Sequence, residues 1–359
     1  MPDRAHEWTD ERIEELADRM REVYSQAAED MRAKLDDWLR DYERKNARWR
    51  EDVEAGVRTQ AEYSEWLRRR AADEARQREM IDDLTADAVN ADVRARQLIN
   101  DEVPTVLAEN ANWEAFDIDR QIGVDTNFTL YNQDSVRLLV NHSPELLPQL
   151  DVAADIRWSR QKVASAIAQS ILQGETVEET ADRLRRVVGM GEAASLRAAR
   201  TAMTYAEARG RGLAIDRAER MGVPMFREWE AIMDGRTRLS HRQAHGQRVR
   251  GNQRFIVGGS EMMCPGDPSA PGEEVYNCRC AVVGQADYEG ISPLVYIRHS
   301  KLPKGVTEEQ WRKGRYVTNK NDRETNASKR ERGVPVKRKS SSKGSNGTRR
   351  KANGNGKGN

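Results

Sequence analysis

Apolar side chains recur at steps of three and four along residues 10–44, which places one apolar stripe on a long helix. The other face is almost wholly Glu, Asp and Arg, often four residues apart, as is typical of a solvated helix surface. A similar pattern continues through residues 63–99. We therefore expect residues 1–100 to form long charged helices or a coiled-coil-like stalk that packs on its neighbours. The stripe consists of Ile13, Leu16, Met20, Val23, Ala27, Met31, Leu35, Trp38 and Tyr42.

The periodic pattern breaks after residue 100. Pro104 is expected to end the helical stretch, because proline inside a helix removes a backbone hydrogen bond. Asn, Asp and Gly then interrupt any period in residues 110–136, for which we expect irregular structure with one or two short strands around residues 126–131.

Helical signals return in the second half of residues 101–222. Gly174 is a candidate C-terminal cap, and Thr176 precedes Glu179 by three residues, which is a capping box. We expect that box to open a helix through Val188 and a further helix to run from 192 to 221. Residues 101–222 are thus predicted to be a mixed segment followed by a helical bundle.

From residue 223 the pattern changes to short strands. Residues 223–232 read as a strand, 236–245 as a short helix or turn, and 247–250, 254–257 and 277–285 as further strands. We predict a small α+β module over residues 223–290. The expected fold class is therefore α+β, with a mostly helical amino-terminal body ahead of this module.

Charge is distributed unevenly along the 359 residues, whose formal net charge is only +1. Residues 301–359 carry 18 Lys/Arg and 5 Asp/Glu, so the first 300 residues are net acidic. From Arg332 onward nine Lys/Arg lie among Ser, Gly and Asn with no acid. Because such a sequence buries too little apolar surface to offset its chain entropy, we expect residues 291–359 to be a basic, largely disordered tail.

The sequence shows no sign of a membrane or secreted protein. No apolar run approaches the roughly 18 residues that span a bilayer, and the first residues lack the apolar core of a signal peptide. Three cysteines do not make a secreted disulfide framework. We expect a soluble protein of a reducing compartment.

Five residues of the module are candidate metal ligands: His241, His245, Cys264, Cys278 and Cys280. The two histidines are four apart, on one face of a helix, and the last two cysteines are two apart, on one side of a strand. Thiolate and imidazole are the preferred ligands of zinc. The alternative is that the cysteines are small buried hydrophobic residues and the histidines bond to loop carbonyls.

The same segment permits a catalytic interpretation. His241 with Arg236, Arg238 and Ser240 has the groups of a metal-independent nuclease, a base near neutral pH and cations that hold a phosphate. The alternative is an arginine-rich turn whose guanidinium groups bond carbonyls and pair with Asp234. No Walker or Rossmann glycine pattern supports a nucleotide enzyme.

Several short motifs follow one another in the second half of the chain: RT at 200–201, Trp229, DGRTRLSH at 234–241, Gly246, Phe255, PGDP at 265–268 and YNCRC at 276–280. In this order and spacing they resemble the phage Mu F-like minor head protein family, which carries the head-morphogenesis domain of tailed phages and prophages. The resemblance covers residues 190–285 closely, and the preceding helices also look like the amino-terminal halves of such proteins. Ala202 and His245 depart from the pattern, which more often has Glu and Asp there. The matching residues outside the cysteine and histidine set are Arg200, Thr201, Trp229, Asp234, Arg236, Thr237, Arg238, Gly246 and Asn277.

The resemblance implies a structural, non-enzymatic minor capsid protein of the virion, present in the host cytoplasm during assembly. Its implied partners are the portal protein at the head vertex, capsid or scaffold proteins, and genomic double-stranded DNA. No small-molecule substrate and no membrane are expected. A nuclease or toxin-like activity in the module remains the alternative function.

The basic tail is the expected DNA contact. Its phosphate contacts would be independent of base sequence and weakened by salt, because each neutralised phosphate releases counterions. A merely solubilising terminus is the other interpretation. The candidate DNA-binding residues are Lys337, Arg338, Lys339, Lys343, Arg349, Arg350 and Lys351.

Overall fold

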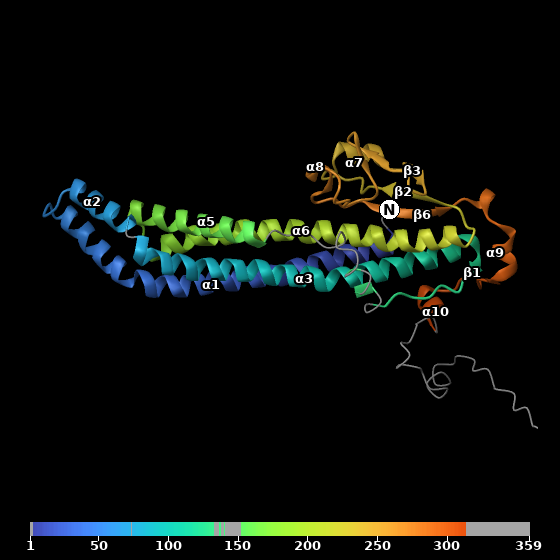
Figure 1. The fold of residues 1–359 in the computed structure, drawn as a ribbon, viewed down its shortest axis with the longest axis horizontal. Coiled ribbons are helices and arrows are strands. Elements are labelled where there is room, and N and C mark those ends of the chain that lie inside the picture. The colour runs from blue at the N-terminus through green and yellow to red at the C-terminus, as the bar shows by residue number, and fades with distance from the viewer. Residues whose placement is uncertain (1–2, 73, 133–135, 138–139, 141–151, 314–359) are drawn as a thin grey trace, which may run out of the picture. The chain divides into compact units, whose positions relative to one another are not determined.

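The computed structural model describes residues 3–313, apart from 73, 133–135, 138–139 and 141–151 and the side chains of 74–76 and 152–156 (Figure 1). The chain divides into two compact units, Met1–Tyr316 and Val317–Asn359, and every described residue lies in the first. None of the described helices combines the length and apolar character needed to cross a bilayer.

A helical body forms most of the first unit. Its long helices α1 (Arg4–Glu54), α3 (Glu74–Ile122) and α6 (Val177–Arg220) pack along one another, and α2 (Gln60–Ala71) and α5 (Val152–Gln173) pack together against them (Figure 1). Helix α6 lies along α1.

The predicted apolar stripe on α1 is buried against α3 and α6. Val23 and Trp38 are the exceptions and are only half-buried, while the adjacent Tyr24 and Leu39 take the inner positions. The charged side chains of α1 lie largely on the opposite, exposed face. Local periodicity therefore identified both the helix and its buried side.

The prediction that Pro104 ends the helix is wrong, because α3 continues to Ile122. A proline inside a helix costs about 3 kcal/mol. Its neighbours Val103 and Leu107 are fully buried in the shared core, and burying side chains of this size contributes roughly 1.5–3 kcal/mol each. Close packing also occurs here, since a Cβ on Gly210 of α6 would collide with the carbonyl oxygen of Leu107.

The stretch expected to be irregular is helical as far as residue 122. Its polar residues break the apolar period because they are buried with distant partners. Asn110 donates to Thr9 Oγ1 at 2.9 Å, and Asp119 accepts from Trp311 Nε1 at 2.8 Å. The strand β1 (Val124–Asp125) is shorter and earlier than expected and pairs with β7 (Ser300–Lys301).

The expected capping signals between α5 and α6 are confirmed. Gly174 follows α5 with a φ of 67°. The backbone of Glu179 donates to Thr176 Oγ1 at 3.2 Å, and the backbone of Thr176 donates to the Glu179 carboxylate at 2.7 Å. The helix does not stop at Val188, however, so the two predicted helices are the single helix α6.

An α+β module of small sheets and short helices lies between Met225 and Ala286. Its central strand β2 (Met225–Glu230) pairs antiparallel with β3 (Arg248–Arg250) and β6 (Ala281–Ala286). Helix α7 (Leu239–Ala244), the hairpin of β4 (Phe255–Val257) and β5 (Ser260–Met262), and α8 (Gly272–Val275) complete it. β6 packs against α3 and α6, so the sheet lies on the helical body (Figure 1).

Part of the segment expected to be a disordered tail forms regular elements. Residues 288–313 include the 3-10 helix η2 (Tyr288–Gly290), α9 (Pro293–Arg298), β7 and α10 (Glu308–Arg312). Trp311 is buried, and its Nε1 donates to Asp119 at 2.8 Å. One buried tryptophan therefore anchors a segment whose composition resembles a solvated chain. The candidate DNA-binding residues, all beyond residue 313, lie outside the described residues.

Candidate metal centre

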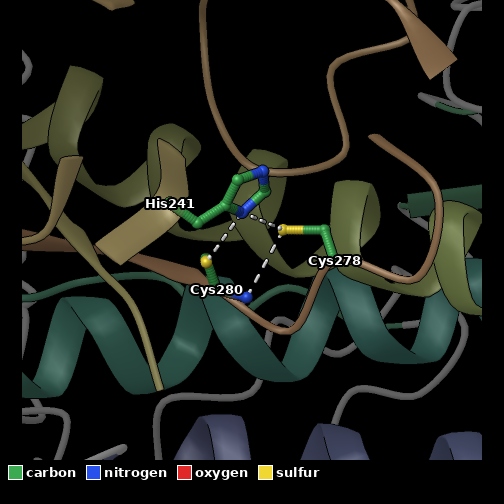
Figure 2. A group of neighbouring side chains, drawn as sticks. All are labelled: His241, Cys278 and Cys280. Carbon is green, nitrogen blue, oxygen red and sulfur yellow. Dashed lines mark hydrogen bonds between the residues drawn. The ribbon is translucent and has the colours of Figure 1, made fainter. Parts of the chain in front are cut away.

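His241, Cys278 and Cys280 meet inside the module (Figure 2). His241 lies on α7, and the cysteines lie between α8 and β6. The Nδ1 of His241 is 3.2 Å from the sulfur of Cys280 and 3.6 Å from that of Cys278. The candidate ligand atoms all lie within 4.8 Å of one another. The three side chains are buried, so the site is closed to solvent.

The cysteine loop is shaped locally and held from the helical body. Asn277 has a φ of 56°, which turns the chain just before the first thiol. The carbonyl of Cys278 accepts from Thr204 Oγ1 of α6 at 3.2 Å. The carbonyl of Arg279 lies 3.2 Å from Nε2 of His6 in the first turn of α1. Backbone groups between the two cysteines are thus fixed by helices distant in sequence.

The buried thiols hold their protons unequally. The hydrogen bond with the Cys280 side chain, followed by that with His241, lowers the pKa of Cys278 well below its usual range. The hydrogen bond with Cys278, together with burial, raises the pKa of Cys280. Burial alone would lower the pKa of His241, but its interactions with Cys278 outweigh this and raise it. A thiolate beside imidazole is the donor set that zinc prefers.

Trp229 provides a test of whether a metal fits this site. Its Nε1 is buried, and among the described residues the Cys280 side chain is its only hydrogen-bonding neighbour. Its ring lies edge-on to His241 with centroids 5.7 Å apart, and its N–H favours the charged form of Cys280. A metal-bound thiolate at Cys280 would therefore supply an acceptor for this donor.

Two predicted ligands are not brought to the group. Cys264 is buried in the same apolar core, where burial raises the pKa of its thiol to about 12. His245 is exposed at the end of α7, and its Nδ1 accepts from the backbone of Ala231 at 3.2 Å. The two histidines therefore do not act together, because the helix ends at Ala244.

Comparison with known proteins identifies the surrounding domain. Residues 161–283 match the family described as Phage Mu protein F like protein. The chain contains a Phage Mu F-like domain. It is also 25% identical over 228 residues to the minor head protein GP7 of Bacillus phage SPP1, covering 63% of this chain and 72% of that protein. The predicted family resemblance is confirmed, and the chain is a homologue of a phage minor head protein.

A second relative has a different name. The chain is 26% identical over 133 residues to the NAD(+)--arginine ADP-ribosyltransferase EFV of Enterococcus faecalis, covering 37% of this chain. The match spans only 27% of that protein. No solved structure matches the chain.

Asp234 connects the two motif segments of the Mu F-like domain, which are residues 234–241 and residues 276–280. Its Oδ1 accepts from the backbone of Thr237 at 3.0 Å and from Nη2 of Arg279 at 2.7 Å. The hydrogen bond from Arg279 is the main reason that the pKa of Asp234 is lowered. Arg238 donates to the carbonyl of Tyr276 in the same loop. This geometry favours the arginine-rich turn over an arrangement of catalytic groups.

The other motif residues of the Mu F-like domain serve packing and turns. Arg200 pairs with Glu14 of α1 at 2.8 Å, and Thr201 donates to the carbonyl of Arg197 within α6 at 3.0 Å. Gly246 has a φ of 78°, which favours glycine there. Arg236 is exposed and donates its backbone N–H to Asp234 at 2.9 Å.

Sequence reasoning missed one neighbour of the metal candidates in the Mu F-like domain. Glu274 of α8 accepts a hydrogen bond from Ser240 Oγ at 2.8 Å and lies 3.0 Å from Nε2 of His241. Nothing in its local sequence distinguishes it from the adjacent Glu273. The link forms across 33 residues and appears only in the folded chain.

Proposed function

We propose that this chain is a structural, non-enzymatic minor head protein that associates with the portal vertex during head assembly. The observation that carries the proposal is the match to GP7, whose 228 residues exceed the length of the Mu F-like domain and so extend beyond it. The likeness therefore includes about 100 residues outside the domain. The long helices offer an extended charged surface for capsid partners.

The test is co-expression of the full chain with the portal protein of the same phage. We expect co-elution at a fixed ratio at physiological salt. A chain that ends at residue 331 is the matched control, because docking through the helices predicts the same ratio without the basic tail. Failure of both chains to co-elute with the portal protein would contradict the proposed location.

We also propose that the basic tail contacts packaged double-stranded DNA. Its support is the run of Lys and Arg with no acid beyond residue 331. Each neutralised phosphate contributes roughly 0.9 to the slope of log K against log salt. Removing residues 332–359 should weaken DNA binding and flatten that slope. Removing only residues 352–359, which contain Lys357 as their one basic residue, should change little. An unchanged slope in the longer truncation would contradict DNA binding by the tail.

We further propose that His241, Cys278 and Cys280 hold a zinc ion that clips the two motif segments together. Their burial, their donor chemistry and the N–H of Trp229, which favours the thiolate of Cys280, support this assignment. The metal would join α7 to the loop before β6. Metal analysis of gently purified full chain should give about one zinc per chain, and Cys280→Ser should lower it. A metal-free wild-type protein that is fully folded would contradict the site.

An enzymatic alternative has one observation in its favour, which is the similarity to the ADP-ribosyltransferase. The burial of His241 and its place between two thiols and a carboxylate oppose a role as a general base. The full chain should be incubated with labelled RNA and DNA, and separately with labelled NAD(+) and an arginine-containing protein. Turnover abolished by His241→Ala would overturn the structural assignment.

A further inference from the structure

The two ring nitrogens of His241 face different partners. Nδ1 faces the sulfurs of Cys278 and Cys280 at 3.6 and 3.2 Å. Nε2 lies 3.0 Å from Oε2 of Glu274. The carboxylate thus contacts the ring nitrogen that does not face the thiols, and it is not a member of the compact ligand group.

The Glu274 carboxylate is itself held in place. Its Oε2 also accepts a hydrogen bond from Ser240 Oγ at 2.8 Å. Its Oε1 lies against the turn between β4 and β5, where a Cβ on Gly258 would collide with it. Gly258 has a φ of 58°, which also favours glycine. Groups from α7, α8 and this turn therefore fix one carboxylate beside the ring.

We propose that Glu274 is a positioning residue for the metal centre, which orients His241 and selects its tautomer. A neutral imidazole has one N–H and one lone pair. The carboxylate accepts the proton at Nε2, so the lone pair of Nδ1 points at the site between the sulfurs. Outer carboxylates of this kind orient ligating histidines and make them more basic. The inference rests on the proposed zinc site and adds the residue that prepares its imidazole ligand.

A simple structural role for Glu274 makes a different prediction. A carboxylate that only joined α8 to α7 would change stability when replaced but leave metal affinity unaltered. A carboxylate that sets the imidazole would change metal affinity while leaving the ligands themselves in place. Metal affinity and the spectrum of a bound reporter metal together separate the two roles.

The test uses full-length chain stripped of metal and titrated with Co²⁺, followed by Zn²⁺ competition against a chromophoric chelator. Glu274→Gln should weaken zinc binding about 10- to 100-fold, while the cobalt–thiolate absorption bands keep their positions and intensity. Glu273→Gln is the matched control, because it removes the same charge from the adjacent, exposed residue. Its zinc affinity should equal that of the wild type.

Ser240→Ala provides a second variant, which leaves the carboxylate present but less restrained. We expect a smaller weakening in the same direction, with circular dichroism confirming the native fold. Wild-type zinc affinity in both Glu274→Gln and Ser240→Ala would overturn the positioning role while leaving the metal site intact. Altered cobalt bands in Glu274→Gln would also overturn it, by making Glu274 a ligand. A wild-type chain that binds neither metal would instead overturn the proposed zinc site.

Discussion

The helical body and the α+β module are stabilised in different ways. In the body, apolar stripes many turns long pack against one another, so the loss of one contact leaves many others. In the module, most strands have only three residues and α8 has four, around a small core that includes Trp229, Phe255 and the cysteines. The stability of the body depends on many similar apolar contacts along its helices, whereas that of the module depends on a few specific interactions.

Metal removal should produce the largest difference in stability between the two regions. A structural zinc contributes on the order of 10 kcal/mol in small folds, so stripping it should expose the amides of α7, β2 and residues 276–281 to hydrogen exchange. The amides in the middle of α1 should keep their protection. Cys280→Ser should reproduce this pattern without a chelator. Unchanged exchange in the module after chelation would show that it needs no metal.

Truncating one core residue in each region should destabilise mainly the region that contains it. Trp229→Ala is expected to cost about 3–5 kcal/mol and Leu84→Ala, in the body, about 2–5 kcal/mol. The first should lower hydrogen-exchange protection mainly in the module, and the second should lower the urea midpoint measured by helical circular dichroism. Equal loss of protection across both regions in either variant would mean that body and module unfold as one.

High pH should weaken the contact between the first turn of α1 and helix α6 in the body. Burial alone would lower the pKa of His6. The negative charge of Glu207, and to a smaller extent that of Asp10, outweighs burial and the opposing charge of Arg211, and the pKa rises from 6.5 to about 9. Because the folded pKa is the higher one, this stability is fully present below pH 6.5 and is lost as the pH rises to about 9. The shift corresponds to up to about 3 kcal/mol.

A buried acid adds to this effect of pH. Burial raises the pKa of Glu114 from 4.5 to about 8, so its contribution also falls as the pH rises across that range. Urea midpoints at pH 6 and pH 9 should therefore differ, and His6→Gln should reduce the difference. The exposed His245→Gln is the control. An equal pH effect in His6→Gln and wild type would rule out His6 as its source.

Helix capping should have the smallest effect. Thr176→Ala removes the cap of α6 and should cost about 1 kcal/mol in the free energy of unfolding. Thr59→Ala removes an equivalent capping box from the short helix α2, whose fraying should affect global stability less. Denaturant titrations of the two variants measure the difference. A larger loss for Thr59 would place α2 among the elements that limit unfolding.

Local signals predicted the parts of the fold that depend on local chemistry. The stripe of α1, the cap at Thr176 and the strand β2 all follow from neighbouring residues. The continuation of α3 did not, because its polar residues find partners far away, as Asn110 does with Thr9. Trp311 likewise anchors its segment through a contact that no local pattern contains.

The candidate site, like the fold, was predictable only where local chemistry identifies a residue. Residue type indicated the five candidate ligands, since imidazole and thiol are distinctive metal ligands, but it did not separate Cys264 from the two last cysteines. Spacing also suggested His245, but the helix that would align it is only six residues long. Glu274 was not predictable, because one glutamate among many acquires a role only through the position that tertiary structure gives it.

The contacts of the first turn of α1 affect how the chain folds during synthesis. His6 finds its partners at Glu207 and at the carbonyl of Arg279, more than 200 residues later. At about 5–20 residues per second, the ribosome takes on the order of tens of seconds to make that stretch. Through this interval α1 has an exposed apolar stripe and no α6 to cover it. The nascent helix therefore needs protection from aggregation during this interval, by chaperones or by rapid pairing with α3.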